Sequence, residues 1–449
     1  MISSSILLSI IFLLYITHQT IFCLAKNNVT SDCVPSERKA LLRFKASLSD
    51  PSNRLSSWTT NDDCCSWAGV ECDDATGHVI ELHLRNRGTV INNIFGIIEF
   101  EDMMLRGNMI DSSLFELKYL SDLDLSFNDF KGSSIPASLG SMKQLQHLNL
   151  SRAGFSGTVP RQLGNLSSLR TLDLGCYNIT GMLPKWLSSF MNLTDLDLSN
   201  NHIEGPMPEL ASNLSRLYLS DNMINGSIPD SLCQMRSLEE LDLSKNQLSG
   251  KLPDCWGNFP SLYGARLSSN QFSGPIPNSL TSLNGLVGLN LSHNHLGGRI
   301  PRKIGDMQSL ESLDLSGNNL SGTIPESLSQ LTFLSHLNLS NNNLSGKIPT
   351  GPQLQTLNNP SIYDGNPRLC GDPLQKKCHI PNETPPNVEN DAKDDDDGDR
   401  ADKIYLCAFI ISGVATGFWG YFGVLVFKRS WRLALFRHMD AVIGRMLGL

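Results

Sequence analysis

The sequence has few charged side chains, no excess of basic residues and none of the short motifs that mark common enzymes. Of its 449 residues only 18% are Asp, Glu, Lys or Arg, below the roughly 25% usual for soluble globular domains. The 36 basic residues are outnumbered by 44 acidic ones, and the net charge of −8 argues against a nucleic-acid-binding protein. Walker, zinc-ligand, nucleophile-elbow and HExxH patterns are absent from the sequence, so we expect neither an enzyme nor a bound metal or cofactor.

Cysteine is sparse and leucine is abundant. Eleven cysteines cannot staple so long a chain throughout, so their positions are more informative than their number. Leucine occupies 69 of the 449 positions, a composition too apolar for a disordered chain. The leucine excess therefore needs an explanation other than a generic core.

The leucines recur at a fixed spacing between residues 79 and 349. Leu-x-Leu-type segments end at Leu125, Leu150, Leu174, Leu198, Leu219, Leu243, Leu267, Leu291, Leu315 and Leu339. Most intervals are 24 residues, a proline follows about ten residues after nearly every leucine, and a glycine marks each turn. This period predicts an α/β-type repeat solenoid, a right-handed leucine-rich-repeat superhelix of about 11 to 12 repeats with a parallel concave sheet.

Each repeat is expected to bury alternate residues of a short strand. In the segment ending Leu241-Asp242-Leu243 the leucines point inward, whereas Glu240 and Asp242 face outward. We interpret Asp124, Asp173, Asp197, Asp242 and Asp314 as solvated strand positions rather than a row of metal ligands.

Three residues beyond most triplets stands an asparagine whose amide can satisfy backbone groups of a neighbouring turn. These residues are Asn128, Asn201, Asn222, Asn246, Asn270, Asn294, Asn318 and Asn342. Ala153 and Tyr177 interrupt the ladder in two early repeats.

Two apolar segments outside the repeats predict where the protein resides. Residues 1–25 have the apolar stretch of a secretory signal peptide but no Lys or Arg, and an uncleaved anchor is the alternative. Residues 404–427 carry no charge and are long enough for a transmembrane helix. Acidic residues before this segment and basic residues after it predict a single-pass type I plasma-membrane protein with an extracellular N-terminus. The basic cytosolic tail, 428–449, is too short for a kinase domain, so any signal must leave through a partner.

Cysteines predict caps at both ends of the solenoid, since an uncapped solenoid exposes its core. Residues 26–78 form the expected N-terminal cap with Cys33, Cys64, Cys65 and Cys72, and 350–380 the C-terminal cap with Cys370 and Cys378. An acidic juxtamembrane stalk follows at 381–403. An apolar insertion near 85–104 interrupts the repeats; packing on the solenoid flank is favoured over contact with a partner.

Three cysteines lie within the repeats. Cys233 and Cys255 fall nearly one repeat apart, and two interpretations are open: a disulfide, or two buried free thiols. Cys176 has no evident partner and is expected as a free thiol exposed on the concave side.

Several motifs together resemble one family. They are Cys-Cys-x-Trp-x-Gly-Val-x-Cys ending at Cys72, the Leu-Ser-Gly-x-Ile-Pro repeats, Asn-Pro-x-Leu-Cys-Gly at 366–371, the acidic stalk, and Phe418-Trp419-Gly420 and Ser430-Trp431-Arg432. Together they resemble the plant leucine-rich-repeat receptor-like proteins, most of all the fungal-elicitor and scab-resistance receptors. The resemblance implies disulfides Cys33–Cys64, Cys65–Cys72 and Cys370–Cys378.

The chain departs from this family in length. Members of the group commonly carry more repeats and a non-repeat island near the membrane, whereas here the 24-residue register runs unbroken from Leu219 to Leu339. The chain therefore resembles a shortened member.

The predicted ligand-binding residues are those that depart from the repeat consensus on or beside the concave strands. They include aromatic and arginine side chains, which are enriched in protein interfaces. They are Phe127, His147, Arg152, Tyr177, Asp195, Arg216, Tyr218, Lys245, Arg266 and His293.

Twelve Asn-x-Ser/Thr sequences are candidate N-glycosylation sites. They are Asn28, Asn149, Asn165, Asn178, Asn192, Asn213, Asn225, Asn290, Asn319, Asn338, Asn343 and Asn382. Glycans at Asn149, Asn290 and Asn338 would cover part of the concave face and disfavour docking there.

The resemblance implies a cell-surface receptor that senses an extracellular, pathogen-derived protein, peptide or glycan and signals in plant defence. Its expected partner is a receptor-like kinase, contacted through the ectodomain and the membrane helix. In that helix Gly413 and Gly417 are either a small-xxx-small contact or ordinary membrane-helix glycines. The alternative functions are a binding or inhibitor module, a non-signalling decoy, and a developmental peptide co-receptor.

Overall fold

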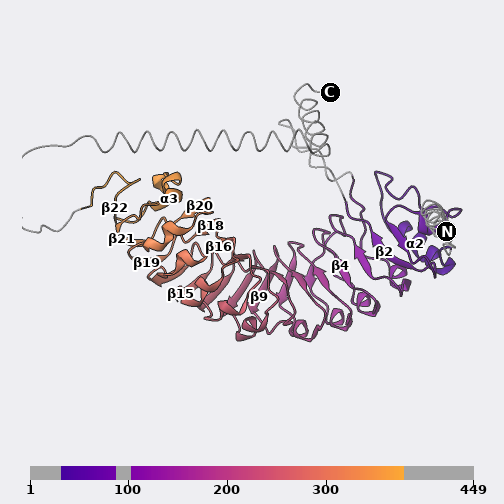
Figure 1. Ribbon diagram of the computed structural model, residues 1–449. Coiled ribbons are helices and arrows are strands. Elements are labelled where there is room, and N and C mark those ends of the chain that lie inside the picture. The colour runs from indigo at the N-terminus through magenta and orange to yellow at the C-terminus, as the bar shows by residue number, and fades with distance from the viewer. Residues whose placement is uncertain (1–31, 87–102, 379–449) are drawn as a thin grey trace, which may run out of the picture. The chain divides into compact units, whose positions relative to one another are not determined.

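The computed structural model describes residues 32–86 and 103–378 (Figure 1). The predicted signal peptide, the centre of the insertion, the acidic stalk, the segment 404–427 with Gly413 and Gly417, the tail 428–449, and the sequons at Asn28 and Asn382 lie outside the described residues. Within the described part, no helix combines the length and the apolar character needed to cross a membrane.

A 12-stranded sheet runs through the repeats on their concave side (Figure 1). Its strands are β1 (Val70–Cys72), β2 (Val79–His83), β3 (Asp122–Asp124), β4 (His147–Asn149), β6 (Thr171–Asp173), β8 (Asp195–Asp197), β10 (Arg216–Tyr218), β12 (Glu240–Asp242), β14 (Gly264–Arg266), β16 (Gly288–Asn290), β18 (Ser312–Asp314) and β20 (His336–Asn338). Only β1 is antiparallel to its neighbour, and from β2 onward every pair is parallel. The predicted parallel concave sheet is confirmed.

The structure has a second, 10-stranded sheet that the sequence did not predict. Most of its strands follow the turn at the end of a concave strand. Its strands are β5 (Gly157–Thr158), β7 (Ile179–Met182), β9 (His202–Pro206), β11 (Met223–Gly226), β13 (Gln247–Lys251), β15 (Gln271–Pro275), β17 (His295–Gly298), β19 (Asn319–Gly322), β21 (Asn343–Lys347) and β22 (Arg368–Cys370). The Leu-Ser-Gly segments form these strands, and their glycines have positive φ, such as 83° at Gly250, a conformation that favours glycine.

The helical part of the repeats consists of short 3-10 helices, so the α/β-type description needs correction there. They are η1 (Cys64–Ser66) in the N-terminal cap, η3 (Ser112–Glu116), η4 (Ala137–Ser141), η5 (Arg161–Asn165), η6 (Lys185–Ser189), η7 (Asp230–Gln234), η8 (Trp256–Asn258), η9 (Asn278–Ser282), η10 (Ile304–Asp306), η11 (Glu326–Gln330) and η12 (Pro360–Tyr363). Most follow a proline directly, with that proline in an extended conformation at the N-cap. In a 24-residue repeat, two strands and their turns leave room for only one helical turn. The described α-helices, α2 (Pro35–Ala46) and α3 (Pro352–Thr356), flank the repeats.

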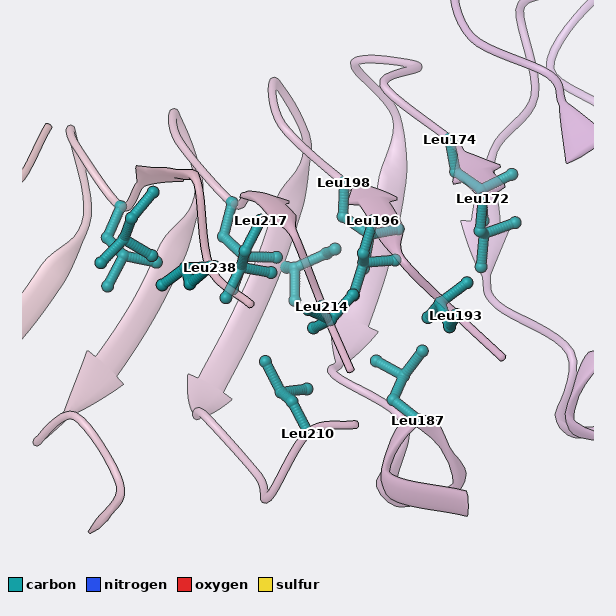
Figure 2. Close-up of a cluster of buried hydrophobic side chains, with 14 of the residues drawn as sticks. Leu172, Leu174, Leu187, Leu193, Leu196, Leu198, Leu210, Leu214, Leu217 and Leu238 are labelled. Carbon is teal, nitrogen blue, oxygen red and sulfur yellow. The ribbon is translucent and has the colours of Figure 1, made fainter. Parts of the chain in front are cut away.

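The leucine row is the core of the stack. Leu241 and Leu243 are fully buried, as the alternation predicts. Strand leucines such as Leu196 and Leu217 point toward Leu187 and Leu210 from the opposite side of the repeat (Figure 2). In the sheet register Leu217 pairs with Leu196 and with Leu241, so the leucines form one continuous column.

The predicted asparagine ladder is present, and its predicted members other than Asn318 are buried. The Asn246 amide donates to the carbonyls of Leu219 (2.8 Å) and Leu243 (3.2 Å), and its oxygen accepts from the Ile224 backbone amide at 3.0 Å. Asn366 in the C-terminal cap continues the ladder by bonding Leu339 and Leu344. Each amide therefore satisfies backbone groups of two neighbouring repeats.

The two interruptions of the ladder are compensated differently. At Ala153 the backbone carbonyl accepts from the Phe130 amide at 2.9 Å, in place of a side-chain oxygen. In the next repeat the thiol of Cys176, one residue before Tyr177, donates to the Leu150 carbonyl at 3.0 Å. The expectation of an exposed Cys176 is thus wrong: this free thiol is 3% exposed and takes the place of the ladder amide.

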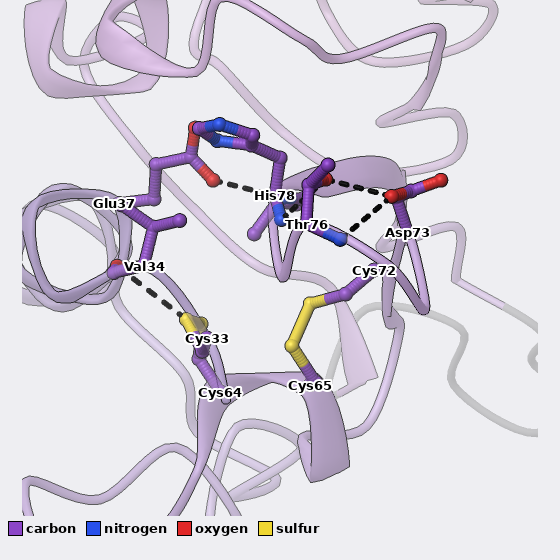
Figure 3. Close-up of polar contacts among 10 residues, drawn as sticks. Cys33, Val34, Glu37, Cys64, Cys65, Cys72, Asp73, Thr76 and His78 are labelled. Carbon is purple, nitrogen blue, oxygen red and sulfur yellow. Dashed lines mark hydrogen bonds and ion pairs between the residues drawn. A yellow bond between two sulfur atoms is a disulfide. The ribbon is translucent and has the colours of Figure 1, made fainter. Parts of the chain in front are cut away.

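Disulfides form within each cap as the resemblance implies, and one more lies within the repeats. Cys33 pairs with Cys64, Cys65 with Cys72 and Cys370 with Cys378 (Figure 3 shows the first two). Cys233 and Cys255 also form a disulfide, with Cα atoms 5.7 Å apart, which decides between the two interpretations.

The N-terminal cap is tied to the first repeat strand by a buried carboxylate. Glu37 of α2 accepts from the Val79 amide at 2.8 Å and lies 2.9 Å from Nδ1 of His78 (Figure 3). The cap thereby seals the first leucine layer and satisfies an amide at the start of β2.

Candidate functional site

The structure gathers most of the predicted ligand-binding residues into two clusters on the concave side. The first occupies the turns that follow β2, β3, β4 and β6. The second lies on β8, β10, β12 and β14. Because consecutive strands carry both, the two clusters form one row along the sheet.

The first cluster is a ladder in which arginine and aromatic side chains alternate. The guanidinium of Arg85 lies 4.9 Å from the ring centre of Phe127. Arg152 lies 5.4 Å from Phe127 and 5.6 Å from Tyr177, so its cation is shared between two rings. We call these four residues the arginine–aromatic ladder. Cation–π contacts of this kind hold flat side chains in fixed positions at a surface.

Backbone conformation places the ladder at the edge of the sheet. Phe127, Arg152 and Tyr177 have φ of 58°, 50° and 76°, which turns the chain sharply just after the strand. Arg152 and Tyr177 are exposed, and Phe127 is half-buried. The ladder therefore offers solvent a cation between two aromatic faces.

The second cluster centres on Glu240. Its carboxylate accepts hydrogen bonds from the hydroxyls of Tyr218 (2.5 Å) and Tyr263 (2.9 Å) and from the Arg266 guanidinium (2.8 Å). Gly264 lies beside it, where even a Cβ would come within 3.4 Å of the Glu240 Cγ atom. We call Tyr218, Glu240, Tyr263 and Arg266 the Glu240 cluster.

The electrostatics of this cluster follow from its hydrogen bonds. Burial by itself raises the pKa of Glu240, but the bonds from Tyr218, Tyr263 and Arg266 outweigh it and hold the pKa below its usual value. Burial and its hydrogen bond to Glu240 raise the pKa of Tyr218, and the hydrogen bond that Tyr263 makes to Glu240 raises the pKa of Tyr263. The cluster at neutral pH is one carboxylate held by two neutral phenols and a guanidinium.

Arg216 and Asp195 form an ion pair next to the Glu240 cluster. The Nε atom of Arg216 donates to Asp195 on the adjoining strand, and this bond raises the pKa of Arg216. Both residues lie on consecutive parallel strands in register. They extend the polar surface by one repeat toward the arginine–aromatic ladder.

Three predicted residues lie apart from these clusters. His147 on β4 contacts the Thr171 hydroxyl, with 3.0 Å between Nδ1 and Oγ1. Lys245 is exposed, with its Nζ 4.0 Å from a carboxylate oxygen of Asp221. His293 occupies a positive-φ turn beside Gly317.

Sequence reasoning missed Arg85, Glu240 and Tyr263. Glu240 stands 24 residues after Arg216, and Tyr263 stands 24 residues after Glu239. Aligning the repeats would have placed the members of each pair at the same strand position in neighbouring repeats, with opposite charges in the first pair and an acid and a hydroxyl in the second. Arg85 borders the irregular insertion, where the period gives no guide.

The strand aspartates and the cap cysteines are engaged in structural contacts. Asp242 accepts from the Ser244 amide at 3.0 Å and hydroxyl at 2.6 Å, which closes the turn after the strand. Among the described residues, Asp63 lies close to the sulfurs of Cys33, Cys64 and Cys65, but these cysteines are in disulfides and offer no thiolate to a metal.

The described sequons fall into two groups by exposure. Asn149, Asn290 and Asn338 on the concave strands are half-buried, and their side-chain oxygens accept from the serine two residues on. The exposed ones are Asn165, Asn178, Asn192, Asn213, Asn225, Asn319 and Asn343. Glycosylation of either group remains a prediction, with the exposed group more accessible to modification.

Comparison with known families identifies an N-terminal cap domain and repeats within the array. Residues 34–73 match the family described as leucine rich repeat N-terminal domain. Residues 301–344 match leucine rich repeat, and 144–166, 192–214, 213–235, 237–259 and 285–307 match single repeats of the same description.

Known proteins similar to this chain include plant receptors. Receptor-like protein EIX2 of Solanum lycopersicum is 44% identical over 144 residues, which is 32% of this chain but 13% of that protein. The match thus spans about an eighth of that relative. The solved ectodomain of the Arabidopsis thaliana receptor kinase GASSHO1/SCHENGEN3, in complex with CASPARIAN STRIP INTEGRITY FACTOR 2, is 36% identical with a TM-score of 0.57, over 60% of this chain and 32% of that one. A solved plant ice-binding protein is 30% identical with a TM-score of 0.57, over 78% of this chain and 99% of that one.

Proposed function

We propose that this chain, a leucine-rich-repeat protein of the plant receptor-like protein group, is a plasma-membrane sensor of an extracellular ligand. In this proposal the ligand is a pathogen-derived protein, peptide or glycan bound on the concave face, and the response is plant defence. The chain is single-pass and type I, with its N-terminus outside the cell.

The observation that carries the proposal is the row that the two concave clusters form along consecutive strands. From Arg85 to Arg266 the row crosses eight consecutive strands, roughly 34 Å at the usual strand spacing. Its exposed members are arginines and tyrosines, the types that dominate binding energy at interfaces. Such a length and composition suit an extended chain or a protein edge better than a compact small molecule.

A leaf assay tests this function. Leaf tissue expressing the full-length chain receives a fungal culture filtrate divided into protein, peptide and glycan fractions, and the oxidative burst is recorded. Arg152→Gln removes the cation shared by two rings, whereas Arg161→Gln removes an exposed cation on η5, away from the concave sheet.

We expect one fraction to raise a burst with the wild-type chain and with Arg161→Gln, and a several-fold weaker burst with Arg152→Gln. No response to any fraction, or an equal loss in both variants, would refute a sensing role for the concave row.

Signalling is proposed to pass through a receptor-like kinase that contacts the ectodomain and the membrane helix. The support is that the similar solved ectodomain belongs to a membrane receptor kinase. Co-precipitation from plant membranes tests the pairing, with Gly413→Leu/Gly417→Leu compared with a Gly420→Leu/Gly423→Leu control. A kinase that is recovered equally with both variants would rule out the Gly413 and Gly417 contact, and the absence of any kinase would rule out the partner.

The alternative function is a binding or inhibitor module that does not signal. It is favoured by the similarity to the plant ice-binding protein, because this chain covers 99% of that structure. Binding of a filtrate fraction by the purified chain, without any leaf response to that fraction, would select this alternative.

A further inference from the structure

We propose that a groove on the 3-10 helix side of the C-terminal repeats binds an acidic oligosaccharide with regularly spaced carboxylates. The groove runs beside η9, η10 and η11 and is separate from the concave row, so this proposal goes beyond the function proposed above. It consists of two adjoining cavities of about 1110 and 540 Å³ that share Arg299, Ile300 and Arg302 as lining.

The groove is a consequence of how η10 packs. η9 and η11 begin directly after Pro277 and Pro325, whereas η10 begins at Ile304, three residues after its proline. Gly305 of η10 lies so close to η11 that a Cβ atom would be 2.1 Å from the Ser327 carbonyl oxygen. Because η10 is held against η11, the larger cavity opens on its other side, toward η9.

The groove is lined by four cations. Arg299, Arg302 and Lys303 are exposed around the larger cavity, and Lys347 lies at the far side of the smaller one. In the described part of the chain, none of the four takes part in an ion pair. The acidic side chains in the lining are Asp306 and Glu326, so the groove carries a local positive charge in a protein whose net charge is −8.

The backbone fixes where the central cation lies. Arg299 follows β17, and its side chain crosses Gly322 of β19, whose Cβ would be 3.1 Å from the Arg299 Cγ atom. Gly322 has φ of 81°, a conformation in which a larger residue would be strained. Arg299 lines both cavities and therefore lies at their junction.

The remaining lining indicates the class of ligand. Asn278, Ser282, Asn284 and Gln308 present amide and hydroxyl groups, which suit sugar hydroxyls. Ile300 and Ile324 in the lining are each 2% exposed, so neither isoleucine offers its side chain to a peptide. Arg299, Arg302 and Lys303 belong to one repeat, and Lys347 lies on a strand two repeats further on, roughly 10 Å away. A single phosphate would instead require cations that converge on one point. A polymer with one carboxylate per sugar matches this spread.

Titration calorimetry on the full-length chain in detergent tests the proposal. The probe is α-1,4-linked tetragalacturonate, compared with its fully methyl-esterified form and with inorganic phosphate. Arg299→Gln/Arg302→Gln removes two groove cations. Arg236→Gln/Lys251→Gln removes two exposed cations of earlier repeats outside the groove and serves as the matched control.

We expect the wild-type chain to bind tetragalacturonate, more weakly as salt is raised, and to bind the ester at least tenfold less tightly. The groove variant should lose roughly tenfold or more in affinity, since hydrogen bonds to charged groups are the strong ones. The control variant and Arg152→Gln should bind as the wild type does.

Four results would overturn the proposal: no binding of tetragalacturonate, equal binding of the ester, equal losses in the groove and control variants, or preferential binding of inorganic phosphate. A loss confined to Arg152→Gln would instead place glycan binding on the concave row. Failure here leaves the leaf response unaffected, so the two proposals are separable.

Discussion

Replacing Asn246 by alanine is expected to destabilise the whole repeat array. The Asn246 side chain is 9% exposed and bonds backbone groups on either side of it. Alanine would leave the Ile224 amide, now 3.0 Å from the side-chain oxygen, and the Leu219 carbonyl, 2.8 Å from the side-chain nitrogen, without these partners.

The magnitude follows from the one group left unpaired. The Leu219 carbonyl keeps a hydrogen bond from the Asn222 amide at 3.2 Å, whereas the Ile224 amide loses its side-chain partner. A buried backbone group that loses its partner costs about 1–3 kcal/mol, and we therefore expect about 2 kcal/mol. Urea unfolding followed by far-UV circular dichroism measures this loss as a lower midpoint with an unchanged slope.

Asn284→Ala provides the control, because Asn284 is exposed and is not part of the asparagine ladder. It should change stability by less than about 0.5 kcal/mol. If Asn246→Ala cost no more than Asn284→Ala, the ladder would not be a stabilising element, and the reasoning from buried amides would be refuted.

Three further predictions concern single features. Burial raises the pKa of Cys176 to about 12, so iodoacetamide should label it, by peptide mapping, only after unfolding; labelling of the folded chain would contradict its burial. Burial and repulsion from Asp197 raise the pKa of Asp173 above 3.8. The stabilising contribution of this group is present below pH 3.8 and is lost as pH rises through the folded-state pKa. Asp173→Asn should therefore stabilise the chain at pH 7 and not at pH 3, and equal effects at both pH values would refute this. The Cys233–Cys255 disulfide closes a loop with a sequence separation of 22 residues. Cys233→Ala/Cys255→Ala should therefore lower the free energy of unfolding in urea by about 3 kcal/mol, and a change near zero would contradict a constraining bond.

The period predicted the fold because it sets the register directly. Leucines 24 residues apart meet across parallel strands, as Leu217 and Leu241 do, and the asparagines between them meet the same backbone groups in each turn. The second sheet was not predictable in the same way. Strands such as Gly157–Thr158 are too short to show an alternating pattern, and their glycines are more typical of turns.

Local exceptions were the main errors. Cys176 occupies the ladder site because the turn is displaced by one residue, which moves the positive φ from the position before Tyr177 to Tyr177 itself. A one-residue displacement leaves the 24-residue count of leucines intact, so the sequence contains no sign of it. Likewise, at Ala153 the backbone carbonyl takes the place of an asparagine side-chain oxygen, and this depends only on the position of the backbone.

The candidate site was predictable as a face but not as contacts. Arg152, Tyr177, Arg216 and Tyr218 stand out because they break the consensus at concave positions. Glu240 does not, because an acidic residue at a strand position resembles the many aspartates of the repeat. Its role depends on Tyr263 and Arg266 from the next strand, a relation that only the register supplies.

The measurement that tests the concave-face proposal most directly is retention of the active filtrate fraction by the immobilised full-length chain. We predict that the wild-type chain and Arg161→Gln retain the activity that triggers the leaf response, and that Arg152→Gln releases most of it into the flow-through. Equal retention by Arg152→Gln and the wild-type chain would contradict the claim that the concave row is the recognition surface.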